Sequence, residues 1–133
     1  MSYDRTVRLS SGFDDTVTAV REALIEQGFG VLTEIDVTAT MKAKLGHEME
    51  DYLILGACNP SLAHQALEAD RNIGLFLPCN VVVRRDGETT LVQALDPGTM
   101  VTLTGLDALR PVAADATKRL DSALAALTPT PAA

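Results

Sequence analysis

The chain of 133 residues contains no tryptophan, and aromatic residues make up only 4% of it. Its core must therefore be built from aliphatic side chains, and the 47% of apolar residues suffice for one globular domain. No apolar run approaches the roughly 20 residues that a transmembrane helix needs. The first residues contain no apolar segment of the kind that forms the centre of a secretory leader, so we expect no signal peptide.

Positive charge is also scarce. Eleven lysines and arginines stand against eighteen aspartates and glutamates, which leaves a formal net charge of -7. Such a chain repels phosphate backbones, and its two basic pairs, Lys42/Lys44 and Arg84/Arg85, are not interleaved with aromatic residues. We therefore expect neither nucleic acid nor a membrane as a partner.

Cysteine occurs only twice, and no Cys-x-x-Cys motif is present. Two cysteines in a chain without a leader predict free thiols in a reducing compartment, so the expected location is cytoplasmic. Both occur in a Cys-Asn step, Cys58-Asn59 and Cys79-Asn80, at the edges of apolar segments. These two thiols are the only soft, redox-active side chains of the predicted core.

Hydrophobic periodicity predicts a single α+β domain over residues 1–127, followed by a disordered tail at residues 128–133. Strands are expected at residues 3–9, 29–37, 52–57, 74–84 and 89–95. Helices are expected at residues 14–27, from a Thr38 cap to Gly46, from residue 60 onward, and at residues 111–127. Pro78 lacks a backbone donor and predicts a bulge or a sheet edge within the fourth strand.

The two cysteines are the first candidate site. Cys58 precedes a helix start at which Asn59 caps and Pro60 takes the first helical position, so nearby amides favour a thiolate. Cys79 shares a strand face with Val81 and Val83, and we expect it to pack as a small hydrophobe. Cys58 should therefore be the more reactive thiol. The spacing of the pair matches no paired-knuckle zinc motif, although two thiols suit a soft metal.

Polar residues near the cysteines extend this candidate site. Asn80 lies on the strand face opposite Cys79, where its side-chain amide either stabilises a bulge at Pro78 or lines a pocket. Asp96 opens a tight turn. We expect a ligand groove between sheet and helices near Cys58, Asn80 and the Asp96 turn.

Other chemistry is less well supported. Glu34, Asp36 and the acidic loop around His47 offer ligands for a divalent metal, but no diagnostic spacing is present and a solvated acidic rim is the favoured interpretation. His64 is expected to be exposed and is poorly spaced for a dyad with Cys58. The glycines at residues 28–30 lead into a strand rather than a helix, which rejects a dinucleotide loop.

Several segments together resemble the domain-of-unknown-function family 302 (DUF302). They are residues 28–37, residues 53–60 with their Cys-Asn-Pro helix entry, residues 77–83 with their Pro-Cys-Asn strand, and the Asp96-Pro97 step. The resemblance implies a TATA-binding-protein-like α+β fold, in which a curved, largely antiparallel sheet is covered by helices on one face. It also implies homodimers and no established reaction. The chain departs from the family pattern at Arg84-Arg85, where many relatives carry an acidic residue.

Residue pattern and resemblance together predict a homodimer, since several strands are apolar on both faces and one layer of helices leaves one sheet face uncovered. We expect an accessory binding domain for a small molecule or a metal, rather than an enzyme. Its predicted ligand-binding residues are Cys58, Asn59, Cys79, Asn80 and Asp96. The alternatives are a thiol-based redox or metal-handling protein that uses Cys58, and a purely structural dimerisation module. The sequence does not identify a cofactor.

Overall fold

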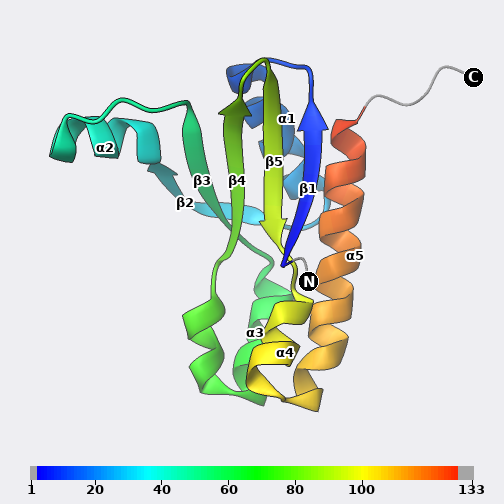
Figure 1. Ribbon diagram of the computed structural model, residues 1–133. Coiled ribbons are helices and arrows are strands. Elements are labelled where there is room, and N and C mark those ends of the chain that lie inside the picture. The colour runs from blue at the N-terminus through cyan, green and yellow to red at the C-terminus, as the bar shows by residue number, and fades with distance from the viewer. Residues whose placement is uncertain (1–2, 129–133) are drawn as a thin grey trace, which may run out of the picture.

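The computed structural model describes residues 3–128, and its centre is a five-stranded antiparallel sheet in the order β1-β5-β4-β3-β2 (Figure 1). The strands are β1 Asp4–Leu9, β2 Gly30–Asp36, β3 Tyr52–Cys58, β4 Cys79–Asp86 and β5 Thr89–Leu95. The predicted α+β class and antiparallel sheet are confirmed. Even β3 and β4, which a helix connects and which could have paired in parallel, are antiparallel.

Helices α1 Phe13–Glu26 and α5 Arg110–Leu127 cover one face of this sheet. The other helices are α2 Val37–Leu45, α3 Pro60–Ala69 and α4 Gly98–Thr104, with short 3-10 helices η1 Arg71–Phe76 and η2 Asp107–Leu109. Helix α1 lies behind the sheet in Figure 1, and α5 runs beside it past β1. The two long helices were predicted at nearly these bounds. None of the helices in the described part of the chain is long and apolar enough to cross a membrane.

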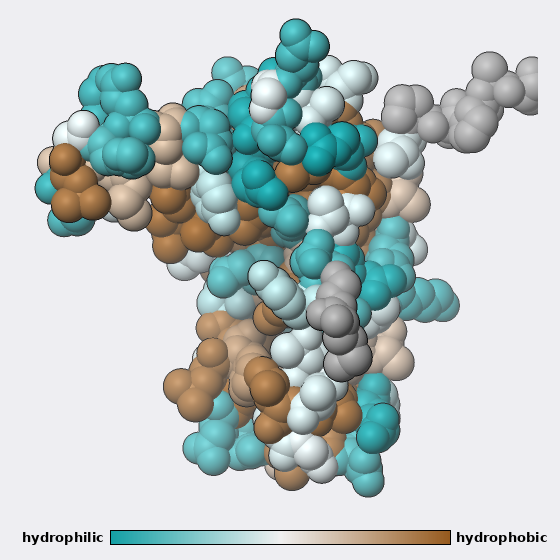
Figure 2. All heavy atoms as spheres, in the orientation of Figure 1, coloured by the Kyte–Doolittle hydropathy of each residue, from teal (hydrophilic) through white to brown (hydrophobic). Residues whose placement is uncertain are grey.

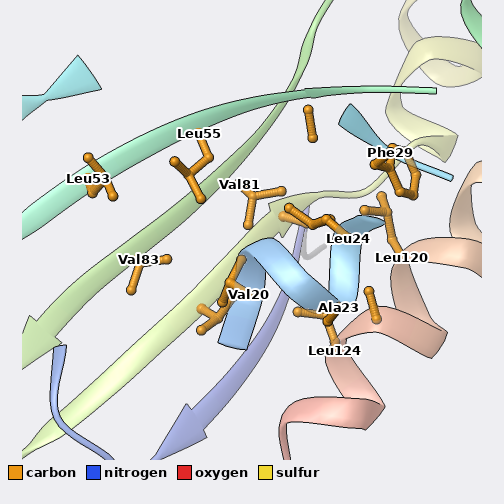
Figure 3. Packing of buried hydrophobic residues seen from close by; sticks show 14 of the residues in the cluster. Val20, Ala23, Leu24, Phe29, Leu53, Leu55, Val81, Val83, Leu120 and Leu124 are labelled. Carbon is orange, nitrogen blue, oxygen red and sulfur yellow. The ribbon is translucent and has the colours of Figure 1, made fainter. Parts of the chain in front are cut away.

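The main core lies between the sheet and helices α1 and α5 (Figure 3). Helix α1 contributes Val20 and Leu24, spaced one turn apart, and α5 contributes Leu120 and Leu124 in the same way. They meet the alternate, inward-facing residues of the strands. These strand residues include Leu53, Leu55, Ala57, Val81, Val83, Val92 and Ala94. The core contains a single buried aromatic ring, Phe29, as the composition predicts.

A second core lies below the sheet, among the helices α3, η1, α4 and α5 (Figure 1). Its buried residues are Leu62, Ala66, Ile73, Met100, Leu109, Val112, Ala113 and Ala116. Helix α5 passes through both cores, so it joins the sheet layer to this helical end. Two parts of this end differ from the prediction. Helix α4 stands where a loop was expected, and residues 74–78 are not a strand.

The start of β4 is corrected by the structure. Residues up to Phe76 form η1, which buries Ile73 to 1% exposure, and the strand begins only at Cys79. Pro78, whose peptide bond to Leu77 is cis, stands before the strand rather than as a bulge within it. The sheet irregularity lies instead in β2, between Val31 and Thr33. A proline without a backbone donor ends the preceding segment more readily than it interrupts a ladder.

Turn and cap residues explain the element boundaries. The Asn59 side chain accepts a bond of 3.2 Å from the backbone amide of Leu62, as the Cys-Asn-Pro entry predicts. Gly87 turns the β4–β5 hairpin at a φ of 60°, which a glycine adopts without strain. Asp36, not Thr38, caps α2 by accepting from the amide of Ala39 at 2.9 Å. Thr38 instead links the backbone of Glu50 and Tyr52.

Strand β2 and helix α2 form a projection that we call the arm, at the left of Figure 1. No residue of either element is buried. Leu32, Ile35 and Leu45 are 68%, 49% and 75% exposed. The arm is attached through the β2–β3 ladder, the bonds of Thr38 and an ion pair of 2.6 Å between Arg21 and Glu34.

Candidate functional site

Three of the five predicted ligand-binding residues line one cavity. Cys79 pairs with Ala57 across β3 and β4, which brings the beginning of β4 beside Cys58 and the Asn59 cap of α3. The cavity is completed by Phe29, Leu62, Ala63, Ala66, Leu77, Met100, Val112 and Ala116. It is almost entirely apolar and measures about 30 Å³. Since one water needs roughly 10–15 Å³, a water or two would fill it.

The chemistry of this cavity is that of two neighbouring thiols. Burial raises the pKa of Cys79, and the nearby charge of Cys58 raises it further. Cys79 is therefore a neutral thiol at physiological pH, as its predicted place among aliphatic side chains requires. Asn59 uses its side-chain oxygen as a helix cap, which accounts for its burial.

The other two predicted residues lie elsewhere. Asn80 is exposed on the opposite face of the sheet from Val81 and Val83. Asp96 forms an ion pair of 3.1 Å with Arg5 and accepts a bond of 2.9 Å from the amide of Gly98, at the start of α4. The structure therefore brings Cys58, Asn59 and Cys79 together, and separates them from Asn80 and Asp96.

Asn80 belongs to the face of the sheet that helices α1 and α5 leave uncovered, which we call the open face. A row of paired residues crosses this face from β1 to β2: Thr6, Gln93, Val82, Ile54 and Ile35. The open face is turned toward the viewer in Figure 1, and Figure 2 shows brown apolar surface between the arm and the centre of the sheet. The face is thus mixed, with amides and hydroxyls toward β1 and aliphatic side chains toward the arm.

A pocket of about 270 Å³ is hollowed into the open face. Its lining residues are Tyr3, Asp4, Tyr52, Asn80, Val82, Gln93, Ala94 and Leu95. Organic ligands commonly occupy pockets of about 300–1,000 Å³, and this hollow is slightly smaller than that range. The sequence prediction named Asn80 alone from this set. Strand alternation could have added Gln93, because it is the one polar residue between apolar neighbours in the middle of β5.

Two other candidates have weaker support. A shallow hollow of about 790 Å³ between α4 and α5 is lined mainly by glycine, alanine and threonine, and its one cation, Arg110, is paired with Asp107 at 2.8 Å. For a metal, residues 3–128 contain no group of three or more His, Cys, Asp or Glu side chains that could hold an ion. Glu34, from the predicted acidic group, is engaged by Arg21, and His64 lies 3.7 Å from Glu68.

Comparison with known proteins agrees with this architecture. Among curated proteins, none matches the chain at a significant level. A solved structure, the crystal structure of an uncharacterized conserved protein DUF302 from Bacillus stearothermophilus, is similar with a TM-score of 0.90 and 33% sequence identity. The alignment covers 96% of this chain and 100% of that one. The family model described as domain of unknown function DUF302 matches residues 5–127, and the chain therefore belongs to the DUF302 family.

Proposed function

We propose that this protein is a homodimeric binding domain that holds a small molecule on the open face of its sheet and catalyses no reaction itself. The observation that carries the ligand part is the open-face pocket of about 270 Å³. The cavity at Cys58 and Cys79, about 30 Å³, has no room for an organic molecule. A small-molecule function therefore favours Asn80 over the two cysteines as the contact residue.

Polar groups of the pocket support a ligand role. The structure shows no hydrogen bond between the side-chain amide of Asn80 and the described residues, and the Tyr52 hydroxyl is likewise without one. Val82 adds apolar surface to the pocket that Asn80 and Tyr52 also line. A few polar groups around an apolar surface is the usual composition of a small-molecule pocket, because the polar groups orient the ligand while apolar contact holds it.

The arm supports the homodimer. An isolated helix of fewer than about 12 residues is marginal in water, and α2 has nine residues with none buried. Strand β2 pairs with β3 on one side and with no described strand on the other. A second copy that pairs β2 with its own β2 would satisfy this free edge and cover Leu32 on both chains.

The arm carries charges of both signs. Helix α2 carries Lys42 and Lys44, whereas the loop that follows it carries Glu48, Glu50 and Asp51, and Lys42 is paired with Glu48 at 3.6 Å within the same arm. Because the two signs are mixed, the arm has no block of like charge that would repel a second copy. The opposite edge of the sheet needs no such partner, because α5 lies beside β1 and Asp121 of α5 bonds to Arg5.

Native mass spectrometry of the purified chain tests the proposal. We expect a species of twice the chain mass that carries a retained small molecule. A monomer without ligand across micromolar concentrations would contradict it. A dimer that never retains or accepts a small molecule would favour the structural dimerisation module instead.

A matched pair of variants tests the interface. Leu32 on β2 and Leu103 on α4 are equally exposed, at 68% and 67%. Leu32→Lys places a charge on the strand edge and should convert the dimer to monomer, because lysine on an edge strand opposes pairing. Leu103→Lys should leave the dimer intact. Sedimentation velocity distinguishes the two outcomes, and equal behaviour of both variants would place the interface elsewhere.

A thiol-based function is the second candidate, supported by the shared cavity of Cys58 and Cys79. The raised pKa of Cys79 leaves Cys58 as the nucleophile of such a pair. Free thiols also support a reducing, cytoplasmic location. Rapid modification of Cys58 by a peroxide, followed by a Cys58–Cys79 disulfide in peptide mapping, would favour this function over ligand binding.

A further inference from the structure

We propose that the open-face pocket binds a small organic carboxylate, and that the guanidinium of Arg84 is the group that holds the carboxylate. This inference rests on the proposed function and names the ligand class for that same pocket. The supporting observation is which partner each arginine side chain has in a chain with net charge -7.

Most arginines are neutralised by carboxylates. Ion pairs engage Arg5, Arg8, Arg21, Arg71, Arg110 and Arg119. In the part of the chain that the structure describes, only Arg84 and Arg85 have no carboxylate partner. Arg85 is nevertheless satisfied, since it donates to the backbone oxygens of Ser11 and Gly87 and to the hydroxyl of Thr90. Arg84 alone among the described arginines has neither a carboxylate partner nor a full set of other acceptors.

Arg84 lies on the open face, in the row next to the pocket. It pairs with Leu91 on one side and with Tyr52 on the other. Its Nε donates a bond of 2.8 Å to the side-chain oxygen of Gln93, which lines the pocket. The bond positions the guanidinium but uses one donor only. The terminal nitrogens, Nη1 and Nη2, have no partner among residues 3–128.

A half-buried, positioned guanidinium with two parallel donors matches a carboxylate, which accepts both in a bidentate arrangement. Tyr52 and Asn80 supply further polar groups, and Val82 and Leu95 supply apolar surface for the body of the ligand. Arg8, the other guanidinium of the same row, is occupied by Asp86 at 3.0 Å and offers no competing site.

Titration with benzoate, followed by backbone amide NMR shifts, tests the inference. We expect benzoate to move the amides of Val82 and Gln93, and to bind more tightly than neutral benzamide. Arg84→Gln should weaken benzoate binding at least about tenfold, because a hydrogen bond to a charged group is lost. Arg84→Lys should retain part of the affinity, since it keeps the charge and loses the fork.

Arg71→Gln is the control, because it removes the same charge at η1, away from the sheet. It should change the affinity by less than about twofold, since salt screens distant charges. Unfolding midpoints of the variants verify that each is folded. Equal binding of benzoate and benzamide, equal effects of both glutamine variants, or no benzoate shifts on β4 and β5 would each overturn the inference. The proposed function would survive any of these if native mass spectrometry shows another molecule retained.

Discussion

Strands β2 and β3 are neighbours of seven residues each, paired with one another in the same sheet, and yet they differ completely in burial. β3 lies between two strands and buries Leu53, Leu55 and Ala57. β2 lies at the edge and buries nothing. Backbone pairing thus places a strand, but side-chain packing provides most of its stability. In β2 only Val31 packs against the core, and this is the strand for which we propose a partner from a second copy.

The largest expected difference between the two strands is the loss of stability when a leucine in each is truncated to alanine. Leu55→Ala removes a side chain with 0% exposure and should lower the free energy of unfolding by about 2–5 kcal/mol. Leu32→Ala, measured at a concentration that keeps the chain monomeric, should change it by less than about 0.5 kcal/mol. Urea denaturation measures both. Comparable losses would mean that β2 is packed within the monomer.

A second substitution acts where the two strands touch. Gly56 of β3 has Thr33 of β2 and Pro78 above it, and a Cβ at this position would lie 2.8 Å from Cγ of Pro78. Gly56→Ala should therefore destabilise the protein by about 1–3 kcal/mol through overpacking and should loosen β2 first. Gly74→Ala, at a site with nothing within 4 Å, is the control. If both variants unfold at the same urea concentration, Thr33 and Pro78 move aside without a measurable loss in the free energy of unfolding.

The two cysteines test the environment at the C-terminal end of β3, where Cys58 and Cys79 line the same cavity. Cys79→Ser should cost about 1–3 kcal/mol, because it buries a hydroxyl among aliphatic side chains. Cys58→Ser should cost less, since amides at the start of α3 can satisfy its oxygen. Alkylation of the native protein with peptide mapping should label Cys58 before Cys79. Faster labelling of Cys79 would show that the exposed thiol has been assigned to the wrong position.

The smallest effect is a pH dependence. Because the folded-state pKa of Cys79 is raised, the folded state retains a proton that the unfolded state loses above the ordinary thiol pKa, about 8.5. Stability should fall as the pH rises through this range, by at most about 1.4 kcal/mol per unit. Cys79→Ala should remove this part of the slope. An identical slope in the variant between pH 8 and pH 10 would assign the dependence to other groups.

Much of the fold was predictable because its signals are local. The spacing of Val20 and Leu24, the Asn59 cap and the Asp86-Gly87 turn each depend on residues close in sequence. The start of β4 was not predictable from local signals. Leu75 and Leu77 suit a strand, but the core contact of Ile73 and the absent donor of Pro78 decide otherwise.

The candidate site was harder to predict than the fold, for the same physical reason. The neighbourhood of Cys58 and Cys79 follows from strand pairing that only the folded sheet defines. The pocket around Asn80 brings together residues from β1, β3, β4 and β5. The free donors of Arg84 become visible only once every other arginine has been matched with its partner. Such a site is a property of the tertiary structure rather than of any motif.

Amide hydrogen exchange at two protein concentrations tests most directly the central claim that a second copy completes the edge strand. The account predicts that amides of β2 not bonded to β3 exchange slowly in a concentrated sample. On dilution below the dissociation constant they should exchange at least tenfold faster, while amides of β3 keep their rate. Protection of β2 that does not change with concentration would contradict the account, because the strand would then be held by its own chain.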